Sequence, residues 1–194
     1  IVPVLGDGDE ELVVRACASG VVSARDAAIT LLALSTGLRA CDIVVLRMGD
    51  VDWRGHTIGL VQQKTGNPLT LPLPALLLSK LASYVLDERP SSADDHLFLR
   101  SVAPHTRLGD HATVHRVTVQ TFRKAGVDNP KAGTRLLRHN AASRLLAAAV
   151  PLPVREFVSG ESLLYLGWPV PIVVEPVEGK RVAIELRSQH FHIG

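Results

Sequence analysis

The segment RDAAITLLALSTGLRACDIVVLRMGDVDW, at Arg25–Trp53, decides the fold. Ser23 stands just before it and Asp26 follows three residues later, an arrangement that resembles the capping box at the start of a helix. Alanines and leucines then fill a helix that we expect to end near Gly37, because glycine favours helix C-termini. A second helix is predicted over residues 40–48. The segment therefore predicts a corner between two helices.

Beyond this corner the pattern predicts a short sheet and then further helices. Residues 56–62 and 68–73 are expected to be the two strands of a hairpin, with Lys64 near its tip. Helical patterns follow at residues 74–88, 112–125 and 133–149. The predicted fold class is therefore mainly α with a small antiparallel β-sheet, an α+β arrangement.

The character of the sequence changes after residue 158. Residues 168–174 are typical of extended chain, a turn is predicted at 176–179, and RVAIEL at 181–186 alternates as a strand does. We therefore expect an extra C-terminal β-hairpin. The predicted division is a domain at 1–157 followed by an atypical C-terminal segment at 158–194.

Composition excludes several classes of protein. Of the 194 residues, 46% are hydrophobic, which is enough to bury a core. The two cysteines exclude a disulfide scaffold and a zinc site built mainly from cysteine, and they fit a reducing compartment. No apolar run reaches the length of about 18 residues that a membrane span needs. The chain opens with Ile1 and has no signal-peptide pattern, as expected of a fragment or a processed chain.

Positive charge is concentrated in one block of the chain. Residues 100–155 hold ten Lys or Arg against two Asp or Glu, a net charge of +8, whereas residues 1–99 carry −4 and residues 156–194 carry −2. Such an excess favours a polyanionic partner such as a nucleic acid, because each phosphate that is neutralised releases counterions. The alternative is a basic face that contacts only water.

Two cations near the corner and the hairpin are suited to a phosphate. Arg39 follows the helix stop, and Asp42 lies on the same helical face, where it can orient the guanidinium by a charge-assisted hydrogen bond. Lys64 on its turn can reach a phosphate or act as a general acid. Each is also explained, taken alone, as an ordinary surface charge or ion pair.

The last predicted helix carries a second cationic group. Arg135, Arg138 and His139 fall on one face, while Leu136 and Leu137 turn toward the core. Two guanidiniums and an imidazole on one face repel each other unless an anion lies between them. A phosphate site is therefore one interpretation, and an exposed basic face is the other.

In this order and spacing, the motifs resemble those of the tyrosine recombinase, or phage integrase, family. The matching text comprises Arg25–Trp53, QQKTGNPLTLPLP at Gln62–Pro74, HLFLRSVAPHTRL at His96–Leu108 and KAGTRLLRHNAASRLLAAAVPLPVREF at Lys131–Phe157. The resemblance covers residues 1–157 and implies the fold of that family's catalytic domain.

The resemblance also implies a mechanism and a partner. A tyrosine hydroxyl attacks a phosphodiester of double-stranded DNA and forms a 3′-phosphotyrosyl link, without a metal or a nucleotide cofactor. Carried over by motif, Arg39 and Arg138 stabilise the charge on phosphorus, with Asp42 as the supporting acid. Lys64 protonates the leaving oxygen, and His139 assists proton transfer. Self-association on DNA and a cytoplasmic, nucleoid-associated location in a bacterium or phage host are expected.

Three positions depart from the family pattern. Arg135 stands where the family usually has histidine, and an arginine can hold phosphate but stays protonated and moves no proton. Glu161 stands where a histidine or similar donor is expected, and it would repel phosphate. Tyr165 is the tyrosine nearest the expected place of the nucleophile, several residues early, and is the candidate nucleophile.

These departures leave two functions open. The first is site-specific DNA recombination or integration, with full or impaired activity. The second is a non-catalytic DNA-binding remnant or regulator with the same fold. A third reading, in which the basic block binds a protein partner, is disfavoured by the length of the match.

Overall fold

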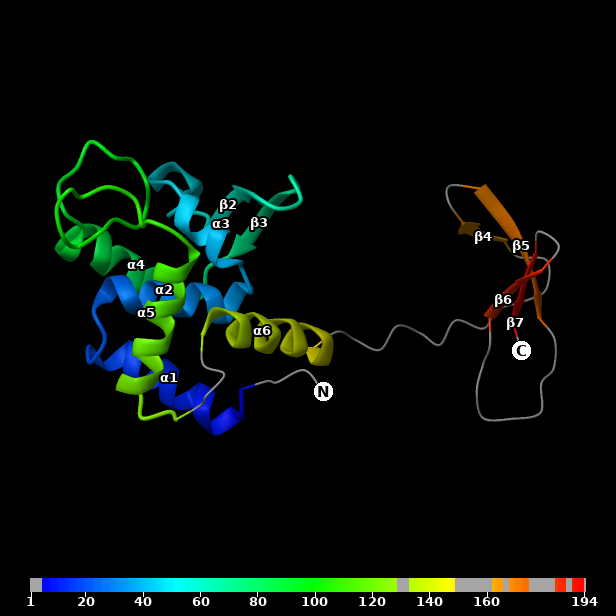
Figure 1. The fold of residues 1–194 in the computed structure, drawn as a ribbon, viewed down its shortest axis with the longest axis horizontal. Coiled ribbons are helices and arrows are strands. Elements are labelled where there is room, and N and C mark those ends of the chain that lie inside the picture. Colours follow the sequence, from blue (N-terminus) through cyan, green and yellow to red (C-terminus); the bar gives the residue numbers. More distant parts are fainter. Residues whose placement is uncertain are drawn as a thin grey trace. The chain divides into compact units, whose positions relative to one another are not determined.

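The computed structural model describes residues 5–128, 133–148, 162–165, 168–174, 184–187 and 190–193 (Figure 1). The chain divides into two compact units, Ile1–Ala148 and Ala149–Gly194. The first unit is mainly helical with one small antiparallel sheet, which confirms the predicted fold class. Among the described residues, no helix is both long and apolar enough to cross a membrane. The predicted domain boundary at residue 157 lies outside the described residues.

One helix forms the centre of the first unit. The helices described there are α1 (Asp7–Ser19), α2 (Ala24–Thr36), α3 (Ala40–Val45), α4 (Ala75–Ser83), α5 (His111–Lys124) and α6 (Thr134–Ala148), with a 3₁₀ turn at Met48–Asp50 and a π-helical turn at Tyr84–Glu88. α2 packs against α1, α4, α5 and α6 (Figure 1). Its residues Ala27–Leu34 are all buried, because a helix enclosed by neighbours has no solvent-facing stripe.

Both ends of α2 follow the predicted signals. Ser23 Oγ accepts a hydrogen bond from Asp26 N at 3.3 Å, which satisfies one of the free amides of the first turn. At the other end Gly37 has a φ of 66°, and its amide donates to Ala33 O at 3.1 Å. A left-handed residue is the usual helix stop, and it places the following residues at the predicted corner.

The helix after the corner is shorter than predicted. α3 ends at Val45, and Leu46 has the extended angles φ −56° and ψ 140°. Leu46 O accepts a hydrogen bond from Leu97 N at 2.7 Å, and Met48 N donates to Asp95 O at 2.9 Å. The prediction of helix to residue 48 is wrong at this end, because partners distant in sequence draw the backbone out of the helix.

The small sheet carries the predicted hairpin. Its strands β1 (Val51–Asp52), β2 (Thr57–Val61) and β3 (Pro68–Pro72) are antiparallel neighbours in that order. At the tip between β2 and β3, Gln62 N donates to Asn67 O at 2.9 Å and Gly66 N donates to Gln62 O at 2.8 Å. These bonds close the turn on which Lys64 lies exposed.

The described residues of the second unit form four strands in the order β4-β5-β7-β6. They are β4 (Ser162–Tyr165), β5 (Trp168–Val174), β6 (Ile184–Arg187) and β7 (His190–Ile193). β5 pairs with β4 and with β7 rather than with β6, so the predicted hairpin between residues 168–174 and 181–186 is not formed. β6 pairs instead with β7, from which only two residues separate it, because a short connection costs less chain entropy.

Asp94 holds together the long connection between the π-helical turn and α5. Its Oδ1 accepts from His96 N at 3.0 Å and lies 2.6 Å from His96 Nδ1, and its Oδ2 accepts from Arg107 N at 2.9 Å. The His96 amide, then the His96 ring and the Arg107 amide, lower the pKa of Asp94 to about 2. These hydrogen bonds favour the ionised carboxylate in the folded chain.

We expect Asp94→Asn to change the acid sensitivity of the fold. Since folding lowers the pKa of Asp94, its stabilisation is present above the unfolded value of about 4 and is lost as pH falls toward the folded value. The variant should be less stable at neutral pH and should lose less stability than the wild type on acidification. Denaturant unfolding at a series of pH values measures this. Identical pH dependence in the two proteins would contradict it.

Candidate phosphate-binding site

Arg39 is held at the corner between α2 and α3. It is the residue at which α3 begins, and its carbonyl accepts from Asp42 N at 2.9 Å and Ile43 N at 3.0 Å. Just before it, Leu38 is buried and its amide donates to Thr36 Oγ1 at 3.2 Å. The backbone of the corner is thus fixed on both sides, while the Arg39 side chain remains partly exposed.

The corner packs against the helix that carries Arg138. A Cβ added at Gly37 would lie 3.3 Å from Ala141 Cβ, 3.7 Å from Arg138 O and 3.8 Å from Arg138 Cγ. A side chain here would crowd Ala141 and would be strained at the left-handed φ of Gly37, so glycine suits this close approach. The structure therefore brings the Arg39 corner and Arg138 together, although they are far apart in sequence.

The face of α6 is arranged as the sequence predicts. Leu136 and Leu137 are buried in the core, at 2% and 0% exposure. Arg135 is exposed, and Arg138 and His139 are half-buried. The cationic side chains thus share the outward part of the helix.

Asp42 connects the corner to the hairpin. It is completely buried, and its Oδ1 accepts a hydrogen bond from Gln63 N at 2.8 Å. Its Oδ2 is buried without a hydrogen-bond partner in the described part of the chain. The predicted bond from the Arg39 guanidinium to Asp42 is not among the contacts of this carboxylate. The sequence gives no signal for the actual partner, because that partner is a backbone amide on another element.

Lys64 directly follows Gln63, whose amide donates a hydrogen bond to Asp42. The hydrogen bond to Gln63 fixes the base of the turn, and the Lys64 side chain remains exposed. Within the described residues, none of Arg39, Lys64 and Arg138 forms an ion pair with an acid. Three cations on three elements, connected through Gly37 and Asp42, can bind a multiply coordinated oxyanion such as a phosphate.

The two tyrosines of the chain lie in different settings. Tyr84 is 1% exposed, stacks on Phe98 with ring centroids 5.6 Å apart, and its hydroxyl accepts from Leu99 N at 3.0 Å. Tyr84 is therefore a packing residue, and its burial raises the pKa of its hydroxyl. Tyr165, the predicted nucleophile, is the last residue of β4, opposite Trp168. Glu161 lies outside the described residues.

Two further groups of reactive side chains among the described residues are engaged or buried. The one set of side chains in the described part that is spaced for a metal ion is Asp94, Asp95 and His96. Asp94 is bonded as described above, and both oxygens of Asp95 accept from Arg47 NH1 at 2.6 Å. Burial raises the pKa of Cys17 to about 12, so its thiol is unreactive at neutral pH.

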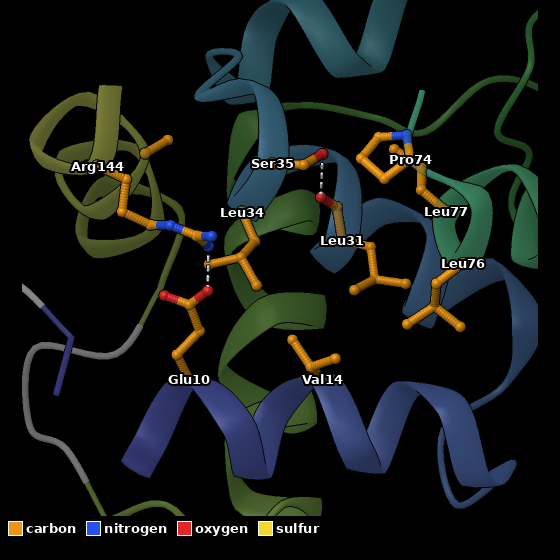
Figure 2. A pocket seen from close by; sticks show the side chains of 10 residues that line it. Glu10, Val14, Leu31, Leu34, Ser35, Pro74, Leu76, Leu77 and Arg144 are labelled. Atoms are coloured by element: carbon orange, nitrogen blue, oxygen red, sulfur yellow. Dashed lines mark hydrogen bonds and ion pairs between the residues drawn. The ribbon is translucent and has the colours of Figure 1, made fainter. Parts of the chain in front are cut away.

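An apolar groove lies beside α6 and was not foreseen from the sequence. It has a volume of about 580 Å³ and is lined by Glu10, Val14, Leu31, Leu34, Ser35, Pro74, Leu76, Leu77, Ala141 and Arg144. Figure 2 shows the leucines of α2 and α4 beside the groove and the ion pair between Glu10 and Arg144 across one side of it. Asn140 Nδ2 also donates to Glu10 Oε2, at 2.6 Å. Ala141, which contacts the Gly37 corner, places this groove within one helical turn of Arg138.

The chain matches a known protein family. The model of the phage integrase family matches residues 5–160. The chain belongs to this family. Its match to the phage integrase family includes the corner, the hairpin and α6.

The chain is also similar to individual proteins and to solved structures. The integrase/recombinase y4gC of Sinorhizobium fredii is 35% identical over 128 residues, which make up 66% of this chain and 65% of y4gC. The crystal structure of XerA recombinase gives a TM-score of 0.64 at 23% identity, covering 76% of this chain and 50% of that one. The XerH site-specific recombinase bound to its difH substrate gives 0.62 at 22% identity, covering 76% and 44%. The two solved structures share the fold.

The match spans only part of each curated relative. The chain spans between about a third and two thirds of the length of the curated relatives that it matches, from 32% to 65%.

Proposed function

We propose that this chain is the catalytic part of a site-specific recombinase that cuts and rejoins double-stranded DNA. The observation that supports this is a pair of contacts at the Arg39 corner: Gly37 lies close to Arg138, and Asp42 accepts a hydrogen bond from Gln63, the residue before Lys64. Membership of the phage integrase family and the fold shared with a DNA-bound recombinase support the same reading. We place the protein with the DNA in the cytoplasm, self-associated on its substrate.

In the proposed reaction a tyrosine oxygen bonds to phosphorus as the bond from phosphorus to the 5′-oxygen breaks. Arg39 and Arg138 stabilise the extra negative charge on the phosphate oxygens during this exchange. Lys64 gives a proton to the leaving 5′-oxygen, and His139 accepts the proton of the tyrosine. Tyr165 is the tyrosine that we assign to the attack. A 5′-hydroxyl then reverses the step, so the bond energy is conserved and no cofactor is consumed.

The DNA-binding part of this proposal predicts strong salt dependence. Each phosphate that the protein neutralises contributes about −0.9 to the slope of log K against log salt. Affinity for a labelled duplex should therefore fall steeply between low and physiological salt. Fluorescence anisotropy titrations at several salt concentrations measure the slope. A slope near zero would overturn the phosphate contacts.

A non-catalytic DNA-binding role is the second candidate. It is favoured by Arg135, which stands where the family has histidine and cannot move a proton at neutral pH. Covalent trapping on a nicked duplex that carries the recombination site separates the two candidates. A protein–DNA adduct that disappears in Tyr165→Phe supports strand transfer. Binding to the same DNA without an adduct supports the non-catalytic role.

A further inference from the structure

His115, on the exposed side of α5, packs against the start of α6. A Cβ built on Gly133 would overlap the His115 ring at Cε1 and Nδ1, and would lie 3.5 Å from Nε2. The imidazole thus occupies the space in which any other residue at position 133 would have its side chain. His115 is exposed to solvent elsewhere, whereas Gly133 is buried.

Gly133 is the point from which α6 begins. Its φ is 139°, a conformation that side-chain-bearing residues rarely adopt. Its carbonyl accepts from Leu137 N at 3.2 Å, which is the first hydrogen bond of the helix. Leu136 and Leu137 anchor the inner side of this turn in the core. The His115 ring lies against its beginning.

Arg135 and Arg138 leave α6 within the first two turns after this contact. Their guanidiniums are at the ends of long side chains, so a small shift of the helix start displaces the charges relative to a phosphate. Position 135 is also where the sequence departs from the family, since an arginine replaces the usual histidine. A fixed helix start therefore matters for both cations.

We propose that His115 is a positioning residue for the phosphate site: its ring, seated on Gly133, fixes the first turn of α6 and so the placement of Arg135 and Arg138. The inference rests on the proposed function, because it assumes that Arg138 binds a DNA phosphate. It assigns His115 a role through the shape of its ring. A direct contact between a protonated imidazole and DNA is the competing explanation.

Four variants distinguish shape from charge. His115→Ala removes the contact between the ring and Gly133. Affinity for a labelled duplex of mixed sequence should then fall about fivefold, because guanidinium–phosphate contacts depend on where the guanidinium lies. His115→Phe keeps a ring of similar size without a charge and should bind like the wild type. His115→Lys supplies a charge without a ring and should bind like His115→Ala. His111→Ala removes an exposed imidazole one turn earlier on the same helix and should leave affinity unchanged.

The outcomes decide the inference. Wild-type affinity in His115→Ala, or recovery by lysine but not by phenylalanine, overturns the positioning role. Thermal melting of each variant shows whether the fold survives. Gly133→Ala crowds the ring from the other side and should weaken binding as His115→Ala does.

Arg138→Ala in the same titration separates the positioning role of His115 from the proposed function. If Arg138→Ala binds normally, the proposed function fails and the inference fails with it, whereas normal binding by His115→Ala alone overturns only the inference.

Discussion

Arg138→Ala and Arg39→Ala should each weaken DNA binding by about tenfold or more. A hydrogen bond to a charged group contributes about 1.5–3 kcal/mol, and about 1.4 kcal/mol corresponds to a factor of ten in affinity. The salt slope should also decrease by about 1 for each phosphate contact that is lost. Titration of a labelled duplex at several salt concentrations measures both quantities.

Arg144→Ala is the matched control for this prediction. Arg144 lies on the same helix and carries the same charge, but it is paired with Glu10 beside the apolar groove. Its removal changes the net charge equally and should have a small effect. The double variant of Arg39 and Arg138 should lose less than the sum of the single losses, because both residues are assigned to one phosphate. An equal loss in Arg144→Ala would mean that only net charge matters.

Asp42→Ala should destabilise the fold and release the hairpin that carries Lys64. The change removes the acceptor of Gln63 N, and a hydrogen bond of this kind contributes about 0.5–1.5 kcal/mol to stability. Denaturant unfolding measures the stability, and hydrogen exchange at the Gln63 amide reports the local contact. We expect faster exchange at that amide together with weaker DNA binding, since Lys64 is no longer held.

Asp42→Asn is the control that separates shape from charge. Asparagine has nearly the same shape, and its side-chain oxygen can still accept from Gln63 N. This variant should keep the hairpin in place and keep the slow exchange of the amide. If Asp42→Ala left stability and exchange unchanged, the contact would not be what holds the hairpin to the corner.

Much of the first unit follows from local signals. Ser23 and Gly37 define the ends of α2 through their own hydrogen bonds and backbone angles, and these signals are readable from a few residues. The face of α6 is likewise predictable, because a helical repeat places Leu136 and Leu137 opposite the cations.

The contacts that assemble the candidate site cannot be predicted from neighbouring residues in the sequence. The Asp42 carboxylate meets the amide of Gln63, and the His115 ring meets the backbone of Gly133. Backbone groups carry no residue-specific signal, so their partners are invisible in a sequence. The early end of α3 at Val45 and the pairing of β5 with β7 have the same origin, since both depend on segments that meet only in the folded chain.

The central claim is that Arg39, Lys64 and Arg138 bind one phosphate together. Side-chain nuclear magnetic resonance of the arginine Nε–H groups during titration with inorganic phosphate tests it without knowledge of the DNA site. The account predicts that the signals of Arg39 and Arg138 shift together with a single midpoint, while the signal of Arg144 stays still. Separate midpoints for Arg39 and Arg138, or shifts that are equal in Arg144, would contradict it.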